Sequence, residues 1–264
     1  MRLAKLIVIA AAVACSGSIA LAQDADELAK QLSNPIASLI SVPFQFNADF
    51  GAGPDGDGVS YLLNIQPVVP IRLNEDWNLI SRTILAVRFQ DDIFAEDVFG
   101  LGDTTQSFFF SPTISGIDGF TWGVGPVFLL PTATDDRLGS EQWGAGPTGV
   151  ALLQTGKWTT GILANHIWSF AGDDDRADVS TTFLQPFVAY ALGGGQTLSL
   201  NLESSYDWEA EQWTVPMNAG YSKVFSAGGQ LMSWYVGGKA YLTAPEGAPD
   251  WGVRSTLTLL FPSH

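Results

Sequence analysis

Residues 59–89 read VSYLLNIQPVVPIRLNEDWNLISRTILAVRF, and this stretch decides the fold. In its first half, apolar side chains occupy alternate positions from Val59 to Leu73, and the positions between them hold most of the polar ones. A period of two residues is typical of a β-strand. The half from Trp77 to Phe89 alternates in the same way, and 74–76 predicts the turn of a hairpin. Both arms exceed the usual strand length in soluble domains, which predicts a hairpin that crosses a lipid bilayer.

The first residues predict export from the cytoplasm. Arg2 and Lys5 precede the apolar run 6–14, and small residues at Ala20 and Ala22 offer a cleavage site before Gln23. We therefore expect a signal peptide over 1–22. Its removal takes away two of the 12 basic residues and the single cysteine, which leaves a net charge of −17 and no thiol chemistry. A cut at Cys15, as in a lipoprotein, is the weaker alternative because the apolar core before it is short.

The composition indicates a membrane β-protein. Hydrophobic residues make up 46% of the chain and charged residues only 15%, where about 25% is ordinary. After the signal peptide, no apolar run reaches the 18 or so residues of a membrane-spanning helix. A chain of this kind forms either an outer-membrane barrel or a soluble β-protein with a large core. The acidic balance excludes nucleic acid as a partner.

Alternation of this kind recurs along the chain and predicts an all-β fold. We expect a short periplasmic segment over 23–36, with an exposed helix, followed by a barrel over 37–264. The predicted strands are twelve in number, at 37–50, 59–73, 77–89, 104–112, 120–131, 143–155, 158–171, 180–191, 196–207, 213–225, 231–242 and 251–261. An even number of strands suits a closed, antiparallel, up-and-down transmembrane β-barrel with both chain ends in the periplasm.

The connections between these strands favour the barrel over a soluble sandwich. Every second connection, beginning with 51–58, carries acidic residues, whereas those between are mostly short and nearly neutral. Outer-membrane barrels have this asymmetry, because long external loops lie at one end and tight turns at the other. A soluble sandwich has no reason to sort its acids in this way. Six prolines inside the predicted strands oppose the barrel, because proline cannot donate to a strand ladder and each must sit at a bulge or irregularity.

The polar faces of the strands predict a hydrated lumen. An arginine that faced lipid in mid-bilayer would cost roughly 2 to 4 kcal/mol, so Arg82 and Arg254 are expected to point inward. The residues predicted to line the lumen are Asn64, Gln66, Arg72, Arg82, Asn201, Glu203, Lys239 and Arg254.

Several motifs together resemble a family of bacterial outer-membrane barrels. They include Trp122-Gly-Val-Gly-Pro, Trp143-Gly-Ala-Gly-Pro and Ala171-Gly-Asp-Asp-Asp-Arg. The family is described as transporter-like, is related to channels associated with meta-cleavage of phenols, and is sometimes labelled neuromedin U, which these residues do not support. The resemblance covers essentially the whole mature chain. It implies an outer-membrane barrel with a transport role, and it supplies no catalytic residues.

Two further candidate sites would give the protein another function, a cation-binding loop and the histidine of a barrel lipase. Asp173, Asp174, Asp175 and Asp178 form a loop that would bind a hard cation weakly, although a solvated acidic loop is favoured over a dedicated metal site. His166 would be the base of a barrel lipase, but Ser169 lies on the opposite face of the same strand, so we expect no enzyme. We also expect no cofactor.

The sequence therefore predicts an outer-membrane channel through which a small solute diffuses. Twelve strands fall between barrels filled by side chains and wide porins, so a narrow lumen is expected. The alternatives are a structural or surface-binding barrel with a closed lumen and, less favoured, a lipid hydrolase. The expected partners are outer-membrane lipid, the solute and, during biogenesis, periplasmic chaperones and the barrel-assembly machinery.

Overall fold

The computed structural model describes residues 25–114 and 116–261. A short helix covers 25–32, and one 3-10 turn, η1, covers Asp136–Leu138. The strands are β1 (Ile40–Ala52), β2 (Gly58–Ile65), β3 (Val68–Arg72), β4 (Trp77–Asp91), β5 (Val98–Leu101), β6 (Thr104–Pro112), β7 (Phe120–Leu130), β8 (Gln142–Thr155), β9 (Trp158–Gly172), β10 (Ser180–Gly193), β11 (Gln196–Leu202), β12 (Ser204–Asp207), β13 (Gln212–Thr214), β14 (Pro216–Ala227), β15 (Gln230–Tyr241) and β16 (Trp251–Phe261). The signal peptide predicted at 1–22 lies outside the described residues.

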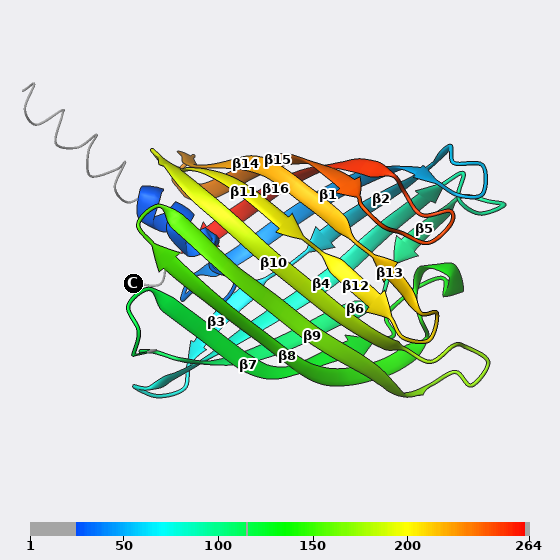
Figure 1. The fold of residues 1–264 in the computed structure, drawn as a ribbon, viewed down its shortest axis with the longest axis horizontal. Coiled ribbons are helices and arrows are strands. Elements are labelled where there is room, and N and C mark those ends of the chain that lie inside the picture. Colours follow the sequence, from blue (N-terminus) through cyan, green and yellow to red (C-terminus); the bar gives the residue numbers. More distant parts are fainter. Residues whose placement is uncertain (1–24, 115, 262–264) are drawn as a thin grey trace, which may run out of the picture.

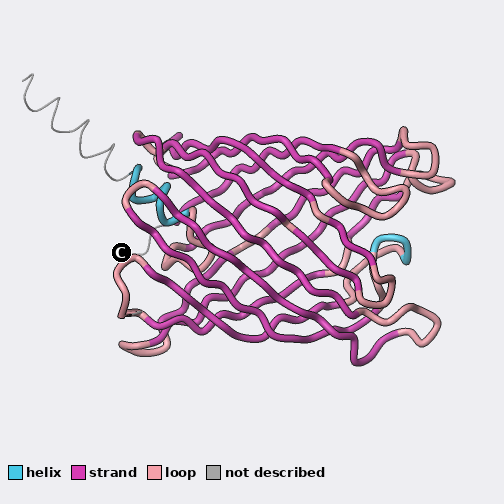
Figure 2. Tube along the Cα trace, in the orientation of Figure 1, coloured by secondary structure: helices cyan, strands magenta, loops and turns pink. Residues whose placement is uncertain are grey.

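These segments close into one antiparallel barrel (Figures 1 and 2). The 16 segments make twelve barrel strands, because four strands are each interrupted once, between β2 and β3, β5 and β6, β11 and β12, and β13 and β14. Closure is made by β1 and β16, whose register runs without a break from Ile40–Phe261 to Phe50–Trp251. The predicted fold class and strand number are confirmed.

Two elements of the structure, β5 and η1, were not expected from the sequence. β5 and η1 lie within connections that were expected to be irregular, and β5 extends the strand of β6 along β4. The alternate connections that begin with 51–58, and that were expected to carry the acidic clusters, all lie at one end of the barrel, here called the loop end. The short turns lie at the opposite end together with the helix 25–32, and this end is called the helix end.

The in-strand prolines lie where a strand ladder is interrupted. The ladder between β1 and the β2–β3 strand lacks pairs beside Pro43 and Pro67. The ladder between β6 and β7 lacks pairs beside Pro126, and the one between β8 and β9 lacks pairs beside Pro147. The strand formed by β11 and β12 lacks pairs with both of its neighbours at its break, beside Pro186 on one side and Pro216 on the other. The carbonyl groups of two of these prolines still accept hydrogen bonds across the gaps: Gln66 N donates to Pro43 O at 2.9 Å, and Glu203 N donates to Pro216 O at 3.0 Å. The prolines are therefore accommodated by ladder gaps within a closed barrel.

The two Trp-Gly-x-Gly-Pro motifs lie on the neighbouring strands β7 and β8 and meet at their prolines. Pro126 lies opposite Pro147 in this ladder. The glycine before each proline allows the neighbouring strand to approach closely, since a Cβ at Gly125 would lie 2.0 Å from Phe108 O and one at Gly146 would lie 1.8 Å from His166 O. In each motif the glycine therefore lets the backbone of the neighbouring strand come close at the position where the following proline has no N–H to donate.

The outer wall has the chemistry of a lipid-facing surface. Large apolar side chains are exposed along the strands, including Leu85, Phe110, Val124, Ile162 and Leu257. Aromatic pairs stand near both ends of the wall: Trp77 with Trp122 and Trp158 with Tyr190 at the helix end, and Phe50 with Trp251 and Tyr206 with Trp208 at the loop end. Such an apolar band between aromatic girdles is typical of outer-membrane barrels. No helix within the described ranges is long and apolar enough to cross a membrane.

The N-terminal helix is not an exposed tail. Ala29 is buried with Leu39, Val224 and Leu260, the last two of which belong to the inner wall at the helix end. Asp26 Oδ1 accepts a hydrogen bond from Gly195 N at 2.6 Å, and Lys30 O accepts one from Gln154 Nε2 at 2.9 Å. The helix was expected to be solvated because its sequence is short and polar on one face. Instead its apolar side, with Ala25, Leu28 and Leu32, packs into the mouth of the barrel.

Candidate functional site

The lumen contains two cavities that share a boundary. One, of about 490 Å³, extends from the helix 25–32 into the barrel, and the other, of about 610 Å³, extends to the loop end. Five residues line both cavities: Gln45, Asn64, Phe183, Glu203 and Arg254. We call these five residues the constriction. Strand alternation places their side chains inward, because the apolar residues between them face the outer wall.

An ion pair lies at the centre of the constriction. Arg254 Nη1 and Nη2 donate to Glu203 Oε1 and Oε2 at 2.7 and 2.8 Å, and Arg254 Nε donates to Asn47 Oδ1 at 2.7 Å. Glu203 lies in the gap between β11 and β12 and keeps the inward face of Ser199 and Asn201 in β11. Such a bidentate, charge-assisted pair fixes both side chains strongly.

A second ion pair stands on the loop side of the constriction. Lys239 Nζ lies 2.8 Å from Asp49 Oδ1 and 2.9 Å from Asp49 Oδ2, and both side chains are almost completely buried. Asp49 and Asn47 come from the polar face of β1, and Lys239 comes from β15. These groups line the larger cavity together with Arg88. A buried carboxylate and ammonium are stable only as a pair, because desolvation of either one alone costs several kcal/mol.

Arg82 and Arg88 are the remaining basic side chains of the barrel wall that line the cavities. Arg82 Nη2 donates to Gln66 Oε1 at 3.0 Å on the helix side of the constriction. Arg88 lines the loop-side cavity, and its buried Nε has no hydrogen-bond partner among the described residues. Within those residues, neither guanidinium group forms an ion pair.

The structure places the predicted lumen residues as follows. Asn64, Glu203 and Arg254 line both cavities, Gln66, Arg82 and Asn201 line the helix-side cavity, and Lys239 lines the loop-side cavity. Arg72 lines neither cavity. It is exposed at the helix end, where its Nε donates to Asn74 O at 3.2 Å within the hairpin turn. Asn64, Gln66 and Val68 all line the helix-side cavity, so the side-chain parity continues across the break after Ile65, and Arg72 lies at the end of β3, beyond that cavity.

Several lumen residues were absent from the prediction although their signal was present. Asp49, Asn47 and Gln45 occupy the polar face of the first strand, and Arg88 shares its face of β4 with Arg82. Alternation alone could have found these four residues. Phe183 could not be found in this way, because an aromatic side chain in a barrel strand is expected on the lipid side.

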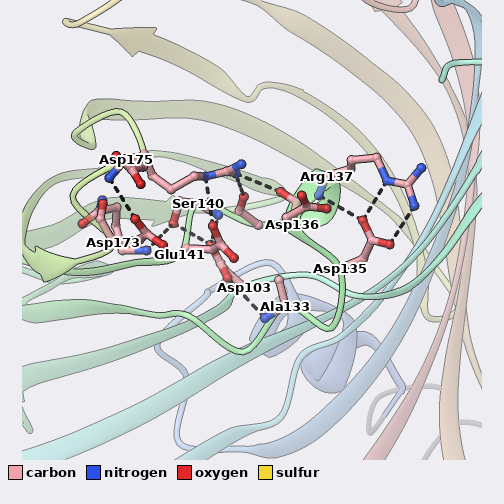
Figure 3. A network of polar contacts seen from close by, with 12 residues as sticks. Asp103, Ala133, Asp135, Asp136, Arg137, Ser140, Glu141, Asp173 and Asp175 are labelled. Carbon is pink, nitrogen blue, oxygen red and sulfur yellow. Dashed lines mark hydrogen bonds and ion pairs between the residues drawn. The ribbon is translucent and has the colours of Figure 1, made fainter. Parts of the chain in front are cut away.

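Loops fold together over the loop end (Figure 3). Asp103 accepts hydrogen bonds from Ser140 N and Ser140 Oγ, both at 2.7 Å. Arg176 lies 3.3 Å from Glu141 and donates to the carbonyl groups of Asp136 and Gly139, which joins two successive long loops. Arg137 donates to both carboxylate oxygens of Asp135 at 2.8 Å, and this pair holds the pKa of Asp135 well below its ordinary range.

The predicted cation loop does not gather its carboxylates. Asp173 Oδ1 accepts a hydrogen bond from Asp175 N, and Asp178 Oδ1 accepts one from Ser169 Oγ, so these carboxylates stabilise the conformation of the loop. Asp174 is exposed. Within the described residues, the acidic side chains that do converge are Asp91, Asp92 and Asp97, with ligand atoms within 4.8 Å of one another.

His166 lies on the outer wall, as its strand alternation predicts. Its Nδ1 is 2.7 Å from Thr182 Oγ1, and its ring lies 4.0 Å from that of Trp168. Ser169 is hydrogen-bonded to Asp178 and Val179, and among the described residues its hydroxyl makes no hydrogen bond to His166. The arrangement is that of a residue in an aromatic girdle.

The fold and the lumen together define an outer-membrane β-barrel of twelve strands. No family model matches the chain, and no curated protein sequence matches it. Among solved structures, the COG4313 outer membrane channel from Pseudomonas putida F1 is similar with a TM-score of 0.68 and 14% identity, over 85% of this chain and 96% of that one. The NanC porin follows with a TM-score of 0.53 and 10% identity, over 85% and 100%. At these identities the likeness concerns the fold.

Proposed function

We propose that this protein is a narrow outer-membrane channel for a small solute. The observation that carries the proposal is the pair of cavities, about 490 and 610 Å³, that meet at a constriction lined by charged and amide side chains. A barrel that served only as a scaffold would need no cavity and could fill its interior with side chains. Here the constriction instead offers hydrogen-bond donors and acceptors to a passing solute, which is how protein pores select.

A closed barrel is the second candidate, and the N-terminal helix favours it. The helix contacts residues from β8, β14 and β16, as well as the turn between β10 and β11, so it covers much of the mouth at the helix end. Further inside, Ile36 packs against Ile80, Phe109, Val150 and other wall residues. In a channel this segment limits the flux, whereas in a structural barrel it seals the lumen permanently.

Single-channel recording in planar bilayers distinguishes the two candidates. We expect a small conductance for the purified barrel, and a larger one for Arg254→Ala, because this change removes a side chain from the constriction and releases Glu203. Arg176→Ala removes an arginine from an external loop and serves as the control, with unchanged conductance expected. Absence of current from the folded protein, and also from a variant without residues 25–35, would exclude the channel and support the closed barrel.

A further inference from the structure

The charge of the lumen is opposite to the charge of the chain. The protein as a whole carries a net charge of −15. The acidic residues that line the two cavities are Asp49 and Glu203, whereas the basic ones are Arg82, Arg88, Arg137, Lys239 and Arg254. Basic side chains therefore outnumber acidic ones around the cavities, whereas most acidic side chains lie in the loops.

Each of the two lumen carboxylates already forms an ion pair with a basic side chain. Glu203 gives both oxygens to Arg254, and Asp49 gives both oxygens to Lys239. The positive charge of the remaining wall arginines, Arg82 and Arg88, is therefore left without a carboxylate in contact.

Glu203 and Asp103 attract these two arginines electrostatically, but neither carboxylate contacts them. Glu203 acts on Arg82 through space, but its oxygens are bonded to Arg254. Asp103 acts on Arg88 through space, but one of its oxygens accepts from Ser140 and the other faces Ala133 N at 3.4 Å. Each arginine consequently keeps donors for another acceptor.

Arg82 and Arg88 lie on opposite sides of the constriction. Both side chains project from the inner face of β4, six residues apart, which corresponds to about 20 Å along a strand. Arg88 lines the loop-side cavity and Arg82 lines the helix-side cavity. An anion that entered from the loop end would meet Arg88 first, then the Glu203–Arg254 pair, and then Arg82.

We propose that the solute is a small organic carboxylate, bound in succession by the guanidinium groups of Arg88 and Arg82. Arginine suits this role because its planar fork of donors matches a carboxylate. Phe183 lines both cavities and Phe187 lines the helix-side one, so an apolar body on the carboxylate would also find a contact surface. This inference rests on the proposed channel function and names the class of its solute.

The acidic loops do not cancel this preference. Most of their carboxylates are exposed to solvent, where the Debye length is about 8 Å at physiological ionic strength. Charges inside the lumen are screened much less, because the barrel wall encloses them. The interior should therefore set the selectivity, while the rim affects mainly the entry rate at low salt.

Reversal potentials in asymmetric salt test the inference. We expect the wild type to prefer chloride, acetate and benzoate over potassium, and the double variant Arg82→Gln/Arg88→Gln to lose this preference by several-fold while it retains conductance. Arg176→Gln is the matched control, because it removes one arginine that lies outside the cavities, and it should keep the wild-type selectivity. Each potassium salt is measured at 0.15 M or above, where the rim is screened.

The outcomes separate this inference from the channel proposal. A conducting wild type that prefers potassium, or a double variant with unchanged reversal potential, overturns the carboxylate preference and leaves the channel standing. If the folded wild type and the variant without residues 25–35 both carry no current, the channel proposal fails and the solute class fails with it. Heat-dependent gel mobility shows beforehand that each variant has folded.

Discussion

Arg254 and Glu203 join two barrel strands that are not neighbours, through paired contacts of 2.7 and 2.8 Å across the lumen. Arg254 comes from β16 and Glu203 from the gap between β11 and β12, with β14 and β15 between them in the wall. The pair therefore has two consequences. It narrows the lumen, and it braces the barrel from inside.

The first prediction concerns the stability that this brace supplies. Glu203→Gln and Arg254→Gln should each lower the free energy of unfolding, because each leaves a partly buried charge without its partner. Loss of one partner of a fully buried pair costs about 3–5 kcal/mol, and a smaller loss is expected here since the Glu203 side chain is 22% exposed. The double variant should lose less than the sum of the two, with a coupling above about 0.5 kcal/mol in a denaturant titration in micelles.

The same double-mutant cycle on the exposed pair Arg176–Glu141 provides the control. Their side chains are 34% and 41% exposed, and such surface pairs contribute about 0 to 1 kcal/mol. Strict additivity of the Glu203 and Arg254 substitutions would contradict the bracing role.

The second prediction concerns the glycine that precedes Pro147. Gly146→Ala should reduce the yield and the thermal stability of the folded barrel, because the new Cβ would lie 1.8 Å from the backbone oxygen of His166 and the strands would have to separate. Gly149→Ala, in the same strand, is the control, because its Cβ would meet its nearest atom at an ordinary 3.6 Å. The fraction that migrates as unheated, folded protein on a gel measures both. Equal folding of the two variants would disprove the close approach.

The third prediction concerns the attachment of the N-terminal helix. Asp26→Ala removes the acceptor for Gly195 N, so the helix should leave the mouth more often and raise the mean current through the open barrel. Glu27→Ala changes the neighbouring acid, whose carboxylate accepts a hydrogen bond from Gln31 of the same helix at 3.4 Å and, among the described residues, none from the barrel wall, and it should leave the current unaltered. The same increase in both variants would point to net charge as its cause.

The fourth prediction concerns the pH dependence of the loop pair Asp135–Arg137. The hydrogen bonds from Arg137 lower the pKa of Asp135 below the ordinary 3.8, so Asp135 binds its proton less readily in the folded loop than in the unfolded chain. The contribution of the pair is therefore complete above about pH 4 and is lost as the pH falls toward the depressed pKa. Carboxyl NMR titration should show Asp135 charged at pH 3.5, and Arg137→Ala should return its pKa to the ordinary range. An unchanged titration in this variant would exclude the pair as the cause.

Much of the barrel could be predicted from the sequence because period-two alternation is a local property. The strands expected at 104–112 and 251–261 have those bounds in the structure. The sorting of acidic connections to one end follows from the up-and-down order of strands, and it too can be read along the chain. Seven of the eight residues expected in the lumen lie around its cavities, since side-chain parity within a strand fixes the face.

What could not be predicted depends on contacts between distant segments. The pairing of Glu203 with Arg254, and of Asp49 with Lys239, is set by which strands the closed barrel brings across the lumen. The gaps beside the prolines belong to pairs of strands, so no single strand reveals them. Arg72 shares the parity of Asn64, Gln66 and Val68 but lies at the end of its strand, and alternation does not show where along a strand the lumen ends. The helix 25–32 looked solvated because its partners, such as Val224 and Leu260, come from the far end of the chain.

That last contact has a consequence for the order of assembly. Ala29 is among the earliest residues of the described chain, yet the surface that buries it includes Leu260, near the end of β16. Leu260 is in place only once β16 has paired with β1. The helix 25–32 precedes every barrel strand in the chain but can dock only after the first and last strands have paired, so its docking marks a closed barrel.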